Sequence, residues 1–302
     1  MSRPLSTELI SSRYGDLDLW STGDAVQAML EGQLGAAAAV QSQVIAIAAA
    51  ADAAATRLRD GIGRLIYVGA GTSGRLAVQD GVELGPTYDW GSDRLVYALA
   101  GGMDALLISV EGAEDDAAAG ARAIRDADPS GADVVIGLAA SGRTPYTVAA
   151  IEAAAVAGTL TIGIASNAGT PLLEAAEHPI LLDTGAEIVA GSTRMKAGTA
   201  QKIALNLLST AVMLRLGRVY QGLMVDMRVS NQKLRERAAT MICEISGVEK
   251  SAADAALDRT GGNIKLAALV TLGAEPEAAA SMLREAGDNL RIAISHIAAA
   301  GR

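Results

Sequence analysis

The sequence of 302 residues has no phenylalanine, and its single cysteine, Cys243, cannot form a disulfide within the chain. A disulfide-stabilised small protein is therefore excluded. Aromatic residues make up 3% of the chain and apolar residues 50%, so the core has to be built from small aliphatic side chains, above all alanine, valine, leucine and isoleucine. Such a core suits helices packed on helices or on a parallel sheet.

The chain also has fewer basic than acidic residues: 25 Lys and Arg and 34 Asp and Glu give a formal net charge of −9. We therefore expect neither nucleic acid nor an anionic membrane surface as a partner. Apolar runs such as Val44 to Ala51 are far shorter than the roughly 18 residues of a membrane-spanning helix. The chain starts with polar residues instead of an apolar signal segment. We expect a cytoplasmic protein with no membrane-spanning part.

From Arg64 onward, short apolar runs alternate with helical stretches, which is typical of parallel β-α-β units. The runs predict strands at 65–68, 96–99, 134–138, 160–164 and 180–182. The stretches between and after them predict helices at 73–83, 115–126, 145–157, 170–177 and 192–216. The predicted fold class is α/β, a five-stranded parallel sheet with helices on both faces.

Helices are expected on both sides of this region. The first twenty residues have no periodicity and are interpreted as an arm. Ser21-Thr-Gly-Asp24 then predicts the start of a helix that ends near Glu31, and an alanine-rich stretch predicts another at 35–60. A helix at 223–245 leads into shorter helices that we expect to form a small bundle. The predicted parts are an N-terminal arm with helices (1–56), the α/β domain (57–222) and a C-terminal helical region (223–302).

Glycine and hydroxyl-bearing residues follow several predicted strands, just before the next helix. The first such loop, 69–75, matches G-x-G-x-x-G, but the second strand does not end in the acidic residue that a dinucleotide site needs. No nicotinamide cofactor is therefore expected. Glycine lets backbone N–H groups converge on an anion, and a helix N-terminus favours negative charge there. Because parallel strands end at one edge of the sheet, the loops predict a phosphomonoester pocket built from Gly71, Thr72, Ser73, Ser141, Gly142, Arg143, Thr144, Asn167, Ser192, Thr193 and Lys196.

Four segments together closely resemble the N-acetylmuramic acid 6-phosphate etherases: 69–75 (GAGTSGR), 110–115 (VEGAED), 139–146 (AASGRTPY) and 191–202 (GSTRMKAGTAQK). The glycine-rich loop and the Ser-Gly-x-Thr loop are common to the wider sugar isomerase (SIS) fold. The combination of the second and fourth segments is far more particular to the etherases. The resemblance extends from about Leu17 to Leu234.

The resemblance implies a homodimeric SIS-fold lyase of peptidoglycan recycling that releases D-lactate from N-acetylmuramic acid 6-phosphate and leaves N-acetylglucosamine 6-phosphate. It places the acid/base glutamates on Glu83 and Glu114, with Glu83 as proton donor to the leaving lactate and Glu114 as base. Glu187 resembles an acid found across the SIS fold, which either touches the ligand or braces a loop. The family's usual Glu-Cys-Pro-Pro-Thr reads Glu-Leu-Gly-Pro-Thr at 83–87 here.

The proposed chemistry is an elimination, for which two glutamates suffice, and no metal or cofactor is expected. Two distant histidines and one cysteine provide no ligand cluster for zinc. If the helix from Ser73 to Glu83 is continuous, its ends lie about 15 Å apart, too far for one hexose phosphate to touch both. Either the helix breaks early or Glu83 serves the phosphate site of a partner subunit.

Two alternatives remain at this point. An aldose–ketose isomerase of the same fold would use the same loops and one base but would release no lactate. A sugar-phosphate sensor would bind without turnover, but neither terminus contains a basic recognition helix. The glucokinase regulatory protein also binds sugar phosphates, but it has two SIS domains and is about twice as long as this chain.

Overall fold

The structure, a computed structural model, describes residues 5–300, with the side chains of residues 5–297. The chain forms two compact units. One comprises the chain up to Gly81 together with Asp93–Ala211, and the other comprises Val82–Ser92 together with the chain from Val212 onward. The part boundaries expected from the sequence, after residues 56 and 222, stay predictions.

The first unit is built on a five-stranded sheet whose strands all run parallel. In chain order the strands are β1 Leu65–Gly69, β2 Leu95–Leu99, β3 Val134–Leu138, β4 Leu160–Ala165 and β5 His178–Leu181. Their order across the sheet is β2-β1-β3-β4-β5. After β2 is added on one side of β1, the later strands are added on the other side. The five-stranded parallel sheet predicted from the apolar runs is confirmed.

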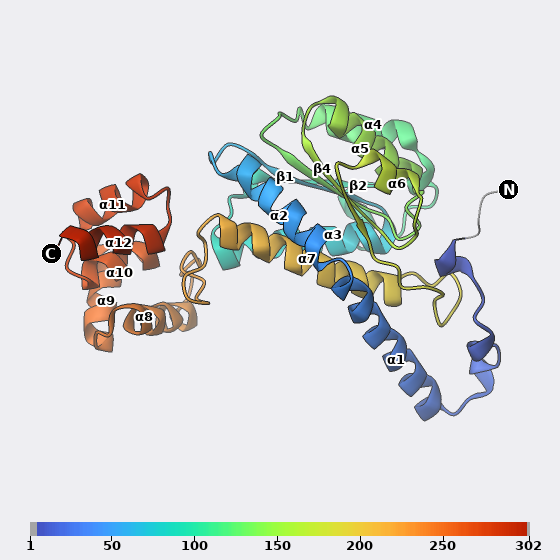
Figure 1. Ribbon diagram of the computed structural model, residues 1–302, viewed down its shortest axis with the longest axis horizontal. Helices are drawn as coiled ribbons and strands as arrows, with labels where there is room; N and C mark the ends of the chain where they lie inside the picture. Colours follow the sequence, from blue (N-terminus) through green and yellow to red (C-terminus); the bar gives the residue numbers. More distant parts are fainter. Residues whose placement is uncertain (1–4, 301–302) are drawn as a thin grey trace. The chain divides into compact units, whose positions relative to one another are not determined.

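Helices cover both faces of this sheet (Figure 1). On one face lie α4 Ala117–Asp126, α5 Pro145–Val156 and α6 Pro171–Ala175. On the other lie α2 Val44–Leu58, α3 Gly71–Tyr88 and α7 Lys196–Arg215. Strands buried on both faces read as continuous apolar runs, which is why the sequence located them well.

Small side chains allow these layers to pack closely, as the low aromatic content requires. Ile66, Val68 and Val135 pack with Ile151 of α5 and Leu172 of α6 in one buried cluster. Alanine residues of α4, α5 and the strand ends fill the remaining space in the same cluster. An aliphatic core without phenylalanine is therefore sufficient for this fold.

The N-terminal helices differ from the prediction. Ser21 caps α1 Thr22–Gln41 as expected, its Oγ accepting the Asp24 N–H at 3.2 Å. The predicted break after Glu31 is wrong, because α1 continues to Gln41 and α2 begins at Val44. Gly32 lies inside α1 at a position where a larger residue would not fit, because a Cβ atom there would lie 2.6 Å from Ile188 Cδ1. This glycine permits close packing of the helix and does not end it.

Helix α3 determines how far apart the candidate groups lie. Its first turn packs directly against the end of β1, at a distance that only glycine allows. A Cβ on Gly69 would lie 2.8 Å from the Cα of Gly74, and a Cβ on Gly74 would lie 2.9 Å from the Gly69 carbonyl. The helix was expected to end at Glu83, but it runs without a break from Gly71 to Tyr88. An early break of α3 is thereby excluded.

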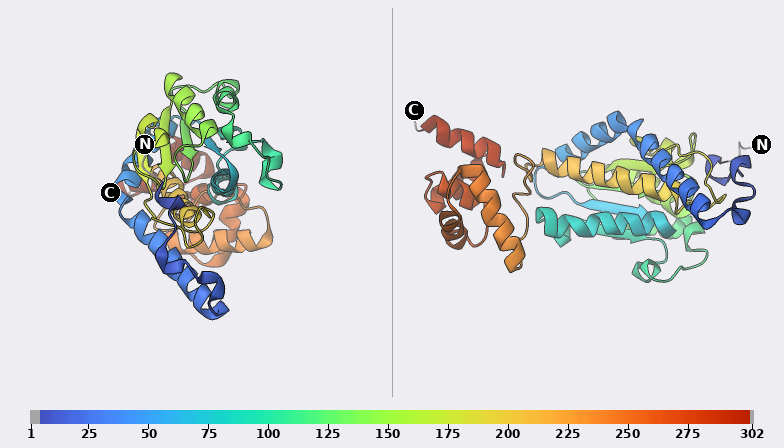
Figure 2. Two further views of the ribbon diagram at one scale, coloured as in Figure 1. Left: turned by 90° about the vertical axis from the view of Figure 1, so that its right-hand side faces the viewer. Right: turned by 90° about the horizontal axis from the view of Figure 1, so that it is seen from below.

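A buried polar network holds α3 against α7, and Figure 2 shows the two helices side by side. The Asp80 carboxylate accepts hydrogen bonds from Tyr67 (3.0 Å), Asn206 (2.9 Å) and Ser209 (3.2 Å). Burial raises the pKa of Asp80, and the three hydrogen bonds oppose that rise. Because every donor comes from a different turn or element, the network fixes α3 at one position relative to α7 and β1.

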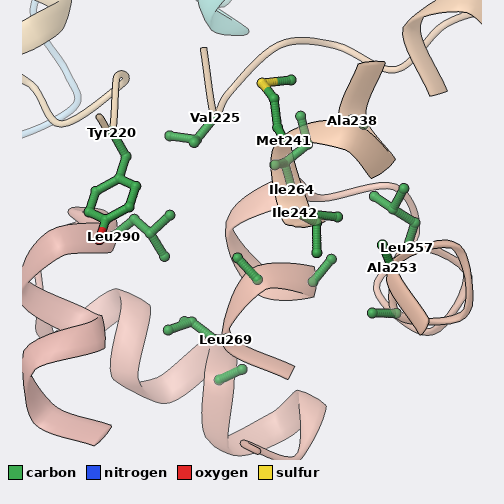
Figure 3. Close-up of a cluster of buried hydrophobic side chains, with 14 of the residues drawn as sticks. Tyr220, Val225, Ala238, Met241, Ile242, Ala253, Leu257, Ile264, Leu269 and Leu290 are labelled. Atoms are coloured by element: carbon green, nitrogen blue, oxygen red, sulfur yellow. The ribbon is translucent and has the colours of Figure 1, made fainter. Parts of the chain in front are cut away.

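The second unit contains α8 Gln232–Ser246, α9 Lys250–Arg259, α10 Ile264–Thr271, α11 Pro276–Glu285 and α12 Leu290–Ala300. Figure 3 shows part of its core, where Ile242, Leu257, Ile264 and Leu269 pack together. The helix predicted at 223–245 starts later than expected. Asn231 caps α8 by accepting the Leu234 N–H at 2.9 Å, and the preceding segment is a turn.

A buried ion pair lies in the same unit. Lys265 is fully buried, and its Nζ lies 2.6 Å from Asp226 Oδ2 and 3.0 Å from Asp288 Oδ2. Burial raises the pKa of Asp226 to about 6, against the lowering effect of Lys265 and Arg218. This pair is a pH-sensitive element of the C-terminal helices.

Within residues 5–300, no single helix has the length and hydropathy needed to cross a bilayer. The pairs α1 with α2 and α10 with α11 reach that length together, but each pair is sharply bent, by 58° and 117° respectively.

Candidate functional site

The loops that follow the strands meet at one edge of the sheet and enclose a cavity of about 350 Å³. Most of the residues predicted for a phosphate pocket line it. The predicted residues among its lining are Gly71, Thr72, Ser73, Glu114, Ser141, Arg143, Thr144 and Thr193. The topology brings together segments that are more than 100 residues apart in the chain.

Ser141 and Thr144 lie in the loop between β3 and α5. The Ser141 hydroxyl accepts the Arg143 N–H at 3.1 Å and lies 3.5 Å from Thr144 Oγ1. Thr144 is the N-cap of α5, but its side chain accepts no capping hydrogen bond, and Pro145 occupies the first helical position. The hydroxyls and the positive end of α5 are therefore available to an anion in the cavity.

Ser73 contributes from the first turn of α3 and is the most enclosed hydroxyl of the group. Its Oγ donates to Gln201 Oε1 of α7 at 2.9 Å, which fixes its orientation. Gly71 and Thr72 precede it at the N-terminus of the same helix. The cavity therefore lies between the N-termini of two helices, α3 and α5, both of which favour negative charge.

Glu114 provides a carboxylate on the wall of the same cavity. It lies in a short 3-10 helix, Ala113–Asp115, after the segment that follows β2. Glu114 is exposed, and no other described residue forms an ion pair or a side-chain hydrogen bond with it. A free carboxylate beside an anion pocket can remove a proton from a ligand whose phosphate the loops hold.

Glu83 does not line this cavity. It lies on α3 twelve residues after Gly71, which at 1.5 Å per residue is about 18 Å along the helix axis. Its side chain is exposed to solvent. The continuous helix thus separates Glu83 from Gly71 and Ser73, two residues that line the cavity.

Asn167, predicted as a ligand contact, forms hydrogen bonds within the protein. Its Nδ2 donates to Thr7 Oγ1 (3.1 Å) and to the Ala140 carbonyl (2.9 Å), while its Oδ1 accepts from Ser6 Oγ at 2.9 Å. The residue is buried. These contacts attach the N-terminal arm to the carboxyl edge of the sheet.

Glu187 is fully buried, and its carboxylate lies at the N-terminus of α7. Its two oxygens accept the N–H groups of Lys196 (3.0 Å) and Ala197 (2.9 Å). Lys196 Nζ in turn donates to the Ala186 carbonyl at 2.8 Å. Bracing of the loop is thus the role visible in the structure, and a ligand contact of Glu187, Lys196, Ser192 or Gly142 stays a prediction.

Glu8 is a cavity-lining residue that sequence reasoning missed. It lies in a 3-10 turn of the arm, Ser6–Glu8, which is held by Asn167 and by a hydrogen bond from the Gly191 N–H to the Thr7 carbonyl at 3.1 Å. Three residues without periodicity give no signal in the sequence. Only the tertiary contacts bring this carboxylate to the cavity.

Among the residues that the structure describes, no three His, Cys, Asp or Glu side chains form a group that could hold a metal ion. The polar groups of the cavity are hydroxyls, backbone N–H groups, carboxylates and one exposed guanidinium, that of Arg143. Such a set is suited to binding a phosphate and transferring protons.

Comparisons with known proteins agree with this geometry. A family model of the glucokinase regulatory protein N-terminal SIS domain matches residues 46–155, and a SIS domain model matches residues 118–211. A structure from Bacteroides fragilis, described as a phosphosugar isomerase involved in capsule formation, covers 67% of this chain and 95% of its own. It is 18% identical with a TM-score of 0.50, which shows the fold alone.

Two relatives are similar over almost the whole chain. An N-acetylmuramic acid 6-phosphate etherase of Deinococcus radiodurans is 48% identical over 292 residues, 96% of this chain and 95% of the relative. An N-acetylmuramic acid 6-phosphate etherase of Rubrobacter xylanophilus is 46% identical over 91% of both chains. The similarity thus extends into the C-terminal helices, beyond the limit near Leu234 expected from the motifs.

Proposed function

Since this chain belongs to the N-acetylmuramic acid 6-phosphate etherase family, we propose that it is a carbon–oxygen lyase that cleaves the D-lactyl ether of N-acetylmuramic acid 6-phosphate. The products are D-lactate and N-acetylglucosamine 6-phosphate, and the reaction belongs to peptidoglycan recycling. The observation that carries the proposal is the meeting of the phosphate loops and the free Glu114 carboxylate at one cavity.

The 6-phosphate binds at the N-termini of α3 and α5. Ser141 and Thr144 donate from the α5 loop, and Ser73 supports them from α3. Gly71 and Thr72 add backbone N–H groups, while Arg143 and Thr193 add further donors at the rim. Hydrogen bonds to a charged group each contribute about 1.5–3 kcal/mol, so these donors hold the phosphate end firmly.

The sugar reacts in its open-chain form, because the aldehyde then acidifies the proton on carbon 2. Glu114 removes this proton, and the ether oxygen on carbon 3 leaves as it receives a proton from Glu83. The products of this step are D-lactate and an unsaturated aldehyde. Water then adds at carbon 3 with the help of a carboxylate base, which gives the product sugar. Each proton removed by one carboxylate is matched by one delivered.

The distance along α3 supports a homodimer with composite sites. Because α3 is continuous, Glu83 of one chain lies too far from its own Ser73 to serve the same substrate, so the acid comes from the partner subunit. Large apolar side chains are exposed next to the site and along the N-terminal helix, as a protein interface requires. They include Leu107, Ile108, Val110, Leu30 and Leu34.

Lactate release from N-acetylmuramic acid 6-phosphate tests the function directly. In water labelled with heavy oxygen, elimination followed by water addition places the label on carbon 3 of the product sugar and leaves lactate unlabelled. Label in the lactate would refute elimination, and an absence of lactate would refute the etherase function. The cytoplasmic location expected from the sequence stays a prediction that cell fractionation can check.

A further inference from the structure

A second cavity, of about 230 Å³, adjoins the phosphate cavity. The two cavities share Ala70, Gly71 and Glu114 as lining residues. The second cavity is otherwise lined by the segment after β2 and by Arg75 of α3, so we refer to it as the Arg75 cavity. Apart from Gly71 and Glu114, which line both cavities, the residues of the Arg75 cavity have no role in the proposed elimination.

Arg75 is half-buried and is held in a fixed orientation. Its Nε donates to the carbonyls of Ala105 and Leu106, both at 3.1 Å, and its Nη2 donates to the Ala105 carbonyl at 2.9 Å. A longer contact joins Nη2 to Ser109 Oγ at 3.4 Å. All of these acceptors are neutral, so the hydrogen bonds position the guanidinium without neutralising its charge.

Two donors of this guanidinium remain. Among residues 5–300, no Asp or Glu forms an ion pair with Arg75, and no acceptor is bonded to its Nη1. A half-buried cation without a counter-ion, at the wall of a cavity, is a natural partner for a carboxylate. The protein has a net charge of −9 and therefore an excess of carboxylates, yet none of those described pairs with this cation.

The substrate carries a second anion at the matching position. Its phosphate is on carbon 6, and its lactyl carboxylate is attached through the ether on carbon 3, next to the carbon 2 proton that Glu114 removes. Because Glu114 lies on the wall shared by the two cavities, the carbon 3 substituent leaves the sugar beside the Arg75 cavity. We propose that this cavity binds the lactyl carboxylate and that Arg75 is its recognition residue, an inference that rests on the proposed etherase function.

The charges of the cavity distinguish this substituent from the neutral acetamide on carbon 2. Glu111 and Glu114 also line the cavity, so an anion is accepted there only next to the guanidinium. A neutral acetamide would gain nothing from the positive charge of Arg75. Arg75 therefore selects substrates that carry the acid and has no role in holding the product sugar, which has lost it.

The test pairs a change in the substrate with a change in the protein. The substrates are N-acetylmuramic acid 6-phosphate and its analogue with the lactyl carboxylate converted to an amide. The wild-type enzyme should prefer the acid by about tenfold or more in kcat/KM, as expected for a hydrogen bond between charged groups. Arg75→Gln should remove this preference, and Arg75→Lys should keep part of it. Arg125→Gln, a change at an exposed arginine of α4, should leave it intact.

Inhibition by N-acetylglucosamine 6-phosphate shows whether each variant keeps a folded phosphate site, since this product carries no carboxylate. Its inhibition constant should be the same for wild type and Arg75→Gln. Equal losses for acid and amide in Arg75→Gln would mean that Arg75 only holds the 105–106 segment, and would overturn the proposal. A wild-type enzyme that treats acid and amide alike would overturn it without any variant. Failure of wild type to release lactate at all would instead refute the proposed function.

Discussion

A mixture of two impaired variants provides the sharpest test of composite sites. Glu83→Gln removes the acid, and Ser141→Ala removes a phosphate donor. In one chain, Ser73 of the phosphate site and Glu83 are ten residues apart on an unbroken helix, or about 15 Å. If each site combines Ser141 of one subunit with Glu83 of its partner, a hybrid dimer contains one site with both native residues and one site with neither.

The expected activity follows from this arithmetic. A purified hybrid should have about half the lactate release of wild type, and a freely reassociated equimolar mixture about a quarter, because half of its dimers are hybrids. Co-expression of the two variants with different affinity tags allows the hybrid to be isolated. Each parental variant, assayed alone at the same concentration, provides the baseline.

Sites formed within one chain give a different result. Every site of the hybrid would then lack either Glu83 or Ser141, and its activity would be the mean of the two parental activities, no higher than that of the less impaired parent. A hybrid that remains at this baseline refutes composite sites, and so does a strictly monomeric species with full activity. A hybrid of Glu83→Gln with Ser251→Ala, a change at an exposed serine of α9, should have at least the activity of the experimental hybrid.

Three further outcomes are expected. Ser141→Ala should lower kcat/KM for lactate release by about tenfold or more through the loss of a donor to phosphate, whereas Ser251→Ala should not. Glu83→Gln should still exchange the carbon 2 proton of the substrate with deuterated water while releasing little lactate, and Glu114→Gln should lose the exchange; the opposite pattern would reverse the two roles. Burial raises the pKa of Asp226 to about 6, so the stability that protonated Asp226 contributes should be lost as pH rises through about 6. Urea unfolding at several pH values should show that Asp226→Asn lacks this fall; an unchanged pH dependence would contradict the assignment.

The strands and the main pocket loops were predictable because the residues that determine them are neighbours in the sequence. A strand buried on both faces must be apolar along its length, and the residues after it are the ones that reach a ligand at the sheet edge. Ser141 and Thr144 therefore lie in the cavity as predicted from the loop pattern. Family resemblance added Glu114, which composition and spacing could not separate from Glu111 and Asp115.

The errors come from contacts between segments distant in sequence. A helix end was predicted near Glu31, but α1 continues through Gly32, where the absence of a Cβ leaves room for Ile188. Val225 and Met227 fall within the helix predicted at 223–245, but they are buried in the segment before α8. Asn167 and Glu187 form hydrogen bonds inside the protein, which the sequence pattern did not show, and a ligand contact of either residue stays a prediction.

The attachment of the N-terminal arm has a practical consequence for handling the protein. Chain ends without periodic structure are usually the places that tolerate truncation or a fusion partner. Here the hydrogen bonds of Ser6 and Thr7 to Asn167 make the first described turn a wall of the substrate cavity, with Glu8 on its surface. Proteolytic removal of this turn would open the cavity to solvent while leaving every strand and α1 in place. The cleaved enzyme would remain folded by circular dichroism and yet bind its sugar phosphate poorly.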